Sequence, residues 1–172
     1  MLPIIILLPL VLGTTLVSWL KQFSRGVTAL AAIGISLSSL VLLLLHAPDV
    51  LNGQVIQQTW RWLPELGLNL SFRLDALGLL FALLISGIGT LIFIYAYYYL
   101  GPKNSLRKLY MLLMLFMAAM LGIALSNNLI LLLTFWELTS ISSFLLVGYW
   151  SNYDAAQRGS RMALTITGMG GL

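Results

Sequence analysis

A chain of 172 residues that is 60% hydrophobic and only 8% charged is far more apolar than a soluble domain, in which about a quarter of the residues carry charge. At about 20 residues per span, this length accommodates five to six helices joined by short loops. The composition therefore predicts an all-α, polytopic transmembrane helix bundle. The net charge of +4 reflects basic loops and does not indicate binding to nucleic acid.

The chain contains no cysteine and a single histidine. Disulfides, thiolate metal sites and cysteine-bound clusters are therefore excluded within these residues. One histidine cannot supply both axial ligands of a bis-histidine haem. We predict no cofactor, no metal and no redox centre in this chain.

Two apolar runs open the chain and predict spans at residues 2–20 and 27–45. The first run has no basic residues before it and no small-residue cleavage site. We therefore expect it to stay in the protein as a helix and not to be removed as a signal peptide. Lys21 and Arg25 lie between the two runs and predict a basic loop.

The longest polar stretch covers residues 46–75 and predicts a folded, extracytoplasmic loop on the membrane surface. Asn52 and Gly53 form a turn signal. The residues that follow include β-branched and aromatic side chains, which favour a hairpin. Trp60 and Trp62 are typical of aromatic anchors at the level of the lipid headgroups.

Three further spans are predicted at residues 76–100, 109–125 and 129–150. The polar turn at residues 126–128 is short, so the last two of these spans should be antiparallel neighbours. A sixth apolar run, at residues 162–172, is too short to span. We treat the chain as a single transmembrane region and expect it to be the N-terminal piece of a longer protein.

The basic residues are distributed unevenly between the loops, and this predicts the orientation. With the N-terminus outside the cytoplasm, seven basic residues fall on the cytoplasmic side and two on the other. The seven are Lys21, Arg25, Lys103, Arg107, Lys108, Arg158 and Arg161, and the two are Arg61 and Arg73. By the positive-inside rule the N-terminus is therefore extracytoplasmic.

Glu137 lies near the middle of the apolar run at residues 129–150. A charged side chain at the centre of a bilayer costs roughly 2.5–3.5 kcal/mol, so such residues usually serve ion or proton transfer. At 3.6 residues per turn, Thr134 and Ser140 share its face of the helix. The pattern predicts a proton-transfer site. The alternative is a neutral acid that is hydrogen-bonded to a serine or threonine and holds helices together.

Two further titratable residues are supporting candidates. Asp75 immediately precedes the span at residues 76–100, where an N-cap is the simplest role and a role in admitting cations is the alternative. His46 follows the span at residues 27–45, where a polar helix end is simpler than a proton shuttle. Arg158 and Arg161 are most simply orientation signals, although either could reach an acidic partner at the cytoplasmic mouth.

Two segments carry a resemblance to a known family. The segment from Thr134 to Trp150, TFWELTSISSFLLVGYW, closely resembles the large A subunit of Mrp-type (multisubunit) Na+/H+ antiporters. This family also includes the antiporter-like membrane subunits of respiratory complex I. The segment from Phe72 to Leu100 extends the resemblance, which covers essentially the whole chain. A small departure is that Ala76 and Gly78 stand where the family has glycine and serine.

The resemblance implies that Glu137 is the fifth-helix glutamate that the family needs for ion translocation. In the family this acid pairs with a lysine on the seventh helix, for which this chain has no counterpart. The resemblance also implies partners: the other subunits of a multisubunit Na+/H+ antiporter complex, membrane lipid, and Na+ and H+ as transported ions. The location that it implies is the bacterial inner (plasma) membrane.

The expected function is therefore that of a membrane subunit in a monovalent cation/proton antiporter, not an enzyme. One alternative is a proton-pumping membrane subunit of a complex I-like NADH:quinone oxidoreductase or a membrane-bound hydrogenase. A second alternative is a purely structural membrane subunit, in which replacing Glu137 by glutamine would leave transport intact.

Overall fold

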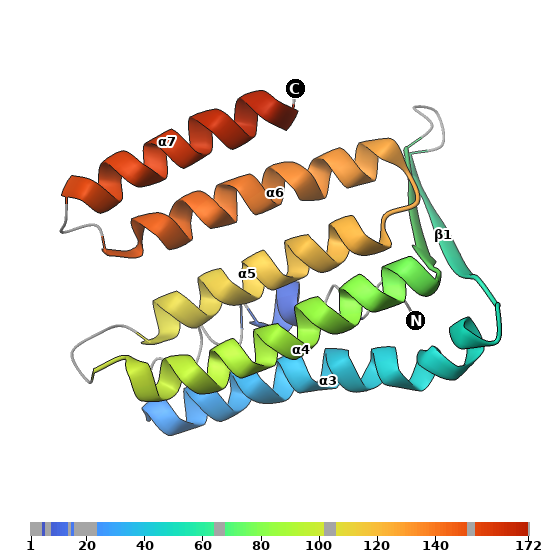
Figure 1. Cartoon of the computed structure of the whole chain (residues 1–172), viewed down its shortest axis with the longest axis horizontal. Helices are drawn as coiled ribbons and strands as arrows, with labels where there is room; N and C mark the ends of the chain where they lie inside the picture. The colour runs from blue at the N-terminus through green and yellow to red at the C-terminus, as the bar shows by residue number, and fades with distance from the viewer. Residues whose placement is uncertain are drawn as a thin grey trace.

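Four long apolar helices run alternately up and down and form most of the molecule (Figure 1). The computed structural model describes residues 5, 8–13, 15, 24–63, 68–101, 106–150 and 154–171. The four helices are α3 (Arg25–Leu51), α4 (Ala76–Tyr99), α5 (Leu106–Leu125) and α6 (Leu129–Val147), and each is long and apolar enough to cross a membrane. A helix satisfies its backbone hydrogen bonds internally, which a segment surrounded by lipid requires.

A fifth helix, α7 (Asp154–Gly171), packs beside α6 on the side away from α5 (Figure 1). A short π-helical turn, η1 (Leu8–Gly13), packs against α3 and α5. Of the span expected at residues 2–20, the structure describes only residues 5, 8–13 and 15, so that expectation lies mostly outside the described residues. The count of five spans and a partial sixth stays a prediction.

An antiparallel hairpin of β1 (Ile56–Leu63) and β2 (Leu68–Leu74) lies across one end of the bundle (Figure 1). The hydroxyls of Thr59 and Ser71, on paired residues, lie 3.0 Å apart. The backbone N–H of Asn127, in the turn between α5 and α6, donates to the carbonyl of Ser71 at 2.9 Å. The hairpin expected from the sequence is confirmed, and we call this the hairpin end of the bundle.

Side-chain caps begin two of the helices at that end. Asp75 Oδ1 accepts the N–H of Gly78 at 2.8 Å, and Asn128 Oδ1 accepts the N–H of Ile130 at 2.9 Å. Each cap satisfies one of the N–H groups that the first turn of a helix leaves without a partner. The N-cap expected of Asp75 is confirmed.

Helix α5 lies at the centre of the packing. Its buried side chains include Tyr110, Met114 and Leu121, which are fully enclosed. On its α6 side, Gly122 carries no side chain, and one there would overlap the ring of Phe135. The expectation that α5 and α6 are antiparallel neighbours is confirmed, and this glycine allows their close approach.

Three element boundaries differ from the sequence expectations. Helix α3 does not end near residue 45 but continues to Leu51, with Pro48 in its last turn. Proline costs one backbone hydrogen bond there, and only three helical residues follow it. Helix α6 ends at Val147, and Gly148–Trp150 form a 3₁₀ turn, η4. The last helix begins at Asp154 instead of residue 162, so Arg158 and Arg161 lie on a helix and not in a loop.

Four of the described basic residues lie near the end of the bundle opposite the hairpin. Arg25 begins α3, Arg107 and Lys108 lie in the first turn of α5, and Arg158 lies near the start of α7. Arg61, on β1, and Arg73, on β2, are at the hairpin end. We call the end that carries Arg25, Arg107, Lys108 and Arg158 the basic end.

Candidate functional site

Glu137 lies on α6, one residue before the central residue of that helix, Leu138. Its side chain is partly buried, and its Oε1 atom is fully buried. Within the part of the chain that the structure describes, Oε1 has no hydrogen-bond partner. An unsatisfied buried carboxylate oxygen is costly, because burial removes its water without supplying a replacement donor.

The hydroxyls that share the face of Glu137 do not supply that donor. Thr134 Oγ1 donates to the carbonyl of Ile130 at 2.8 Å, and Ser140 Oγ donates to the carbonyl of Trp136 at 3.2 Å. Both hydroxyls therefore satisfy the backbone of their own helix. The structure does not bring Thr134 or Ser140 into a hydrogen bond with Glu137 Oε1, and the alternative of a carboxyl tied down by a neighbouring hydroxyl gains no support.

No basic residue pairs with Glu137 among the described residues. The described arginines and lysines lie on the hairpin or near the helix ends, except for Arg161, which lies two turns into α7. Asp75 has such a partner: Arg73 Nη2 lies 3.2 Å from Asp75 Oδ2, and both side chains are well exposed. The mid-helix position of Glu137 and its unpartnered oxygen set it apart from every other described acidic residue.

Asp75 and His46 lie towards the hairpin end and not beside Glu137. Asp75 caps α4, as described above. His46 Nδ1 donates to the carbonyl of Leu42 at 2.7 Å, which fixes the proton on that nitrogen. Both residues have local structural roles, and the structure does not assemble them with Glu137 into one site.

A buried hydroxyl pair was missed by the sequence reasoning. Ser36 Oγ on α3 lies 2.7 Å from Thr90 Oγ1 on α4 and 3.5 Å from the sulfur of Met117. The signal in the sequence was a serine and a threonine, each inside an apolar run, which does not reveal that the two pair. The pair carries no charge, so its chemistry suits helix association and not ion transfer.

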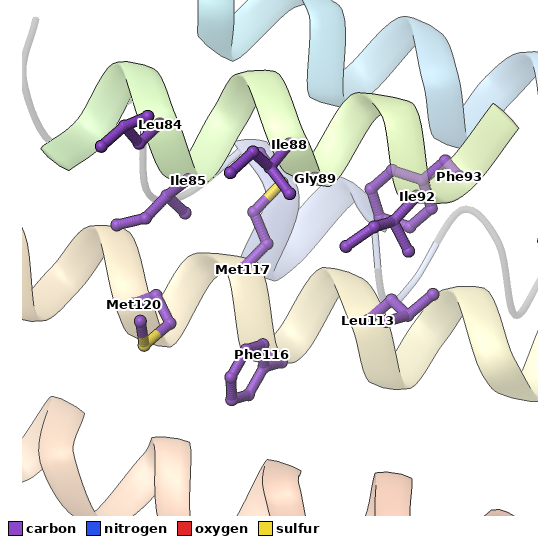
Figure 2. Close-up of a pocket in the computed structure, with 10 residues that line it drawn as sticks. All are labelled: Leu84, Ile85, Ile88, Gly89, Ile92, Phe93, Leu113, Phe116, Met117 and Met120. Atoms are coloured by element: carbon purple, nitrogen blue, oxygen red, sulfur yellow. The ribbon is translucent and has the colours of Figure 1, made fainter. Parts of the chain in front are cut away.

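An apolar pocket lies between α4 and α5, with a volume of about 240 Å³ (Figure 2). Side chains such as Ile88, Phe116 and Met120 line it, and no charged group does. Among the described residues, no three histidine, cysteine or acidic side chains gather as metal ligands would. This pocket offers no chemistry for proton or ion transfer.

Comparison with known proteins gives a consistent assignment. Residues 60–108 match the family described as NADH-ubiquinone oxidoreductase (complex I), chain 5 N-terminus. Along the whole chain, a probable K+/H+ antiporter A/B subunit of Rhizobium meliloti (strain 1021) is 43% identical, and the Na+/H+ antiporter A1 subunit of Staphylococcus aureus is 39% identical. The chain spans 17% and 22% of the length of these relatives.

Two solved structures have the same arrangement of helices. The Mrp complex from Dietzia sp. DQ12-45-1b is 26% identical, with a TM-score of 0.74 over 99% of this chain and 17% of that one. The membrane-bound sulfane sulfur reductase, an archaeal respiratory membrane complex, is 22% identical, with a TM-score of 0.79 over 95% of this chain and 24% of that one. The second likeness shows the fold alone. The resemblance to Mrp-type antiporter A subunits that the sequence motifs indicated is confirmed, and the chain is a multi-pass membrane protein.

Proposed function

For a chain that is similar along its whole length to the A subunits of cation/proton antiporters, we propose the role of a membrane subunit in a multisubunit monovalent cation/proton antiporter. Glu137 is the residue that binds and releases the transported proton. The observation that carries this proposal is the buried Oε1 atom of Glu137, at the middle of an apolar helix, which has no hydrogen-bond partner among the described residues.

The chemistry follows from the two ways in which a carboxyl group can be accommodated there. Without a cation nearby, a bound proton removes the charge that the apolar surroundings oppose. When a cation approaches, the ionised form becomes favourable and the proton leaves. A group with no fixed partner can alternate between these states, and a partner lysine from outside the described residues would drive the change.

The membrane potential supplies the energy in this scheme. One elementary charge that crosses 100 mV releases about 2.3 kcal/mol. An exchange that moves more protons inward than cations outward would therefore expel cations even without a pH gradient. The cation is Na+, K+ or both, because the relatives named above include one of each kind.

The proposed setting is a bacterial plasma membrane, with the basic end facing the cytoplasm and the N-terminus facing away from it. The positive-inside rule supports this orientation, because Arg25, Arg107, Lys108 and Arg158 gather at one end. The other subunits of the complex are the expected protein partners, and lipid is expected against the exposed apolar faces of α3, α4 and α6.

A proton-pumping subunit of a redox complex is the second candidate. It is favoured by the match of residues 60–108 to a complex I family and by the shared fold of an archaeal respiratory membrane complex. The site at Glu137 would work in the same way, but electron transfer in another subunit would drive it.

The two candidates are separated in everted membrane vesicles that contain the complete complex and no other antiporter. ATP hydrolysis acidifies the vesicle interior, a dye reports the pH gradient, and NaCl or KCl is then added. Antiport predicts that the cation collapses the gradient without any electron donor. If neither salt has an effect, and NADH or a reduced electron carrier builds a gradient through this complex, the redox-pump candidate replaces the antiporter.

A further inference from the structure

Strand β2 pairs with β1 along one edge, and the turn between α5 and α6 covers its other edge. The backbone N–H of Asn127 donates to the carbonyl of Ser71 at 2.9 Å, and Asn127 Nδ2 donates to Ser71 Oγ at 3.2 Å. Asn128 Nδ2 donates to the carbonyl of Asn69 at 3.3 Å. We call these three hydrogen bonds the hairpin strap. They satisfy backbone groups that an open strand edge would leave without partners.

The side-chain amide of Asn128 bonds to two different elements. Its Nδ2 atom donates to β2, whereas its Oδ1 atom accepts the N–H of Ile130 in the first turn of α6 at 2.9 Å. The backbone carbonyl of Asn128 also accepts the N–H of Leu132 at 2.9 Å. One planar amide group therefore joins the hairpin to the start of α6. The helix cannot slide or rotate at this end without lengthening one of these bonds.

The hairpin contacts α6 a second time, closer to Glu137. The buried ring of Phe72, on β2, lies 6.4 Å from the ring of Phe135, on α6, measured between the ring centres. Phe135 is two residues before Glu137 and follows Asn128 by about two helical turns. Two contacts at different heights constrain the direction of the helix axis as well as its position.

Helix α6 depends on these contacts because it buries few side chains of its own. Its buried residues are Leu131, Ser140 and Ser142, whereas α5 buries ten. Strand β2, in contrast, is firmly placed: it leads directly into the capped start of α4, and Phe72 forms a bridge with Ser126 at the end of α5. The hairpin strap therefore places α6 relative to both α4 and α5.

We propose that Asn128 is a positioning residue for Glu137. The hairpin strap holds the start of α6 so that the Glu137 carboxyl group keeps one depth and one direction, and the strap stays closed throughout transport. This proposal rests on the proposed function of Glu137. Glu137 lies about 14 Å along the helix from Asn128, at 1.5 Å per residue, and the helix between them transmits a shift at its start. A displacement of about 1 Å at a reacting group can lower a rate by roughly a hundredfold.

The variant Asn128→Asp separates the strap from the helix cap. Aspartate keeps an oxygen that caps α6 as well as asparagine does, but its carboxylate has no N–H for the carbonyl of Asn69. The control is Asn52→Asp, which adds the same charge at the same end of the bundle, in the turn after α3. Cation-dependent dye recovery in the everted vesicles is measured per assembled complex. We expect Asn128→Asp to be at least about tenfold slower and the control to match wild type. A wild-type rate in Asn128→Asp would mean that only the cap matters and would overturn the proposal.

A disulfide tests whether restoring the strap restores transport. Ser71→Cys and Asn127→Cys are added to Asn128→Asp, because the two side chains are in contact and a disulfide can join β2 to the turn again. A membrane-permeant oxidant should restore most of the rate, and a reductant should remove it again in the same preparation, in which assembly is constant. No restoration would overturn the proposal, as would failure of the disulfide to form. Wild type treated in the same way controls for cysteines elsewhere in the complex, since these 172 residues contain none.

The same cysteine pair with Asn128 intact tests whether the strap opens, and it does not require Asn128→Asp to assemble. The proposal predicts that the rate after disulfide formation equals that of wild type or exceeds that of the reduced form. A rate that falls on oxidation and recovers on reduction would show that the strap has to open during transport. That result would overturn the proposal.

A distance measurement distinguishes failure of this proposal from failure of the proposed function. Spin labels replace Leu91 on α4 and Ile141 on α6, two exposed side chains, in a complex whose other cysteines are changed to serine. Pulsed electron paramagnetic resonance should show a shifted or broader distance distribution in Asn128→Asp and the wild-type distribution in Asn52→Asp. An unchanged distribution in Asn128→Asp would overturn the proposal whatever Glu137 does. Full transport by Glu137→Gln would instead refute the proposed function, and the role of the strap in transport with it, even if the distances shift as expected.

Discussion

The contact between Gly122 and Phe135 positions α6, and therefore Glu137, against the central helix α5. A methyl group at Gly122 would overlap the Phe135 ring, so Gly122→Ala forces the ring or the helix to move. Overpacking of this kind costs about 1–3 kcal/mol, which corresponds to a change of roughly 5- to 150-fold in the unfolding equilibrium. We expect a destabilisation in that range.

A double-mutant cycle identifies the cause of this loss. Phe135→Leu alone should destabilise by about 1–2 kcal/mol, because it removes buried ring contacts. Combined with Gly122→Ala, it also makes room for the methyl group. The double variant should therefore be less destabilised than the sum of the single variants, by about 0.5–3 kcal/mol.

The assay is reversible unfolding of the purified protein in mixed micelles of a mild detergent and sodium dodecyl sulfate, followed by tryptophan fluorescence. Gly34, on α3, has nothing within 4 Å of the position that its Cβ would occupy, so Gly34→Ala is the matched control and should be neutral or slightly stabilising. Additive effects of Gly122→Ala and Phe135→Leu would refute the reasoning, as would equal effects of the two glycine substitutions.

Two other contacts give predictions of smaller size. Asp75→Ala should destabilise by about 0.5–2 kcal/mol in the same unfolding assay through loss of the cap on Gly78, whereas Asp75→Asn should retain most of the stability because asparagine also caps helices. Thr90→Val should cost about 0.6 kcal/mol, a typical value for one hydrogen bond between membrane helices, because it removes the bond to Ser36.

The outcomes that would contradict these two predictions are specific. If Asp75→Asn is as stable as wild type but loses cation transport, Asp75 acts through its charge and the role in admitting cations replaces the capping role. If Thr90→Val and Ser36→Ala together cost as much as the sum of the single changes, the two hydroxyls do not interact across the helices.

Hydropathy predicted the bounds of helices whose residues are apolar throughout. It failed for elements whose bounds depend on tertiary packing. The expected span at residues 76–100 differs by one residue from α4, because a long apolar run has a charged residue before it and a glycine-proline pair after it. The sequence prediction placed the start of α7 eight residues too late, because Arg158 and Arg161 make the first turns of this helix polar. The hydropathy pattern does not show that such a segment can be helical beside α6.

At the candidate site, too, some features could be predicted from the sequence and others could not. The central position of Glu137 on its helix could be read from the apolar residues on either side. The hydrogen bonds of Thr134 and Ser140 could not, because sharing a face with a carboxyl group does not determine whether a hydroxyl bonds to that group or to its own helix backbone. The pairing of Ser36 with Thr90 depends on contact between two helices that are distant in sequence, which periodicity does not reveal.

The most direct test of the proposed function is cation-dependent dye recovery in the everted vesicles described above, with wild type, Glu137→Gln and Thr134→Val assembled in equal amounts. Thr134→Val is the matched control, because that hydroxyl bonds to its own helix and not to Glu137 Oε1. We predict that NaCl or KCl collapses the gradient in wild type and Thr134→Val, and that Glu137→Gln responds no more than vesicles without the complex. A full response from an assembled Glu137→Gln complex would contradict the account, because glutamine cannot bind and release the transported proton.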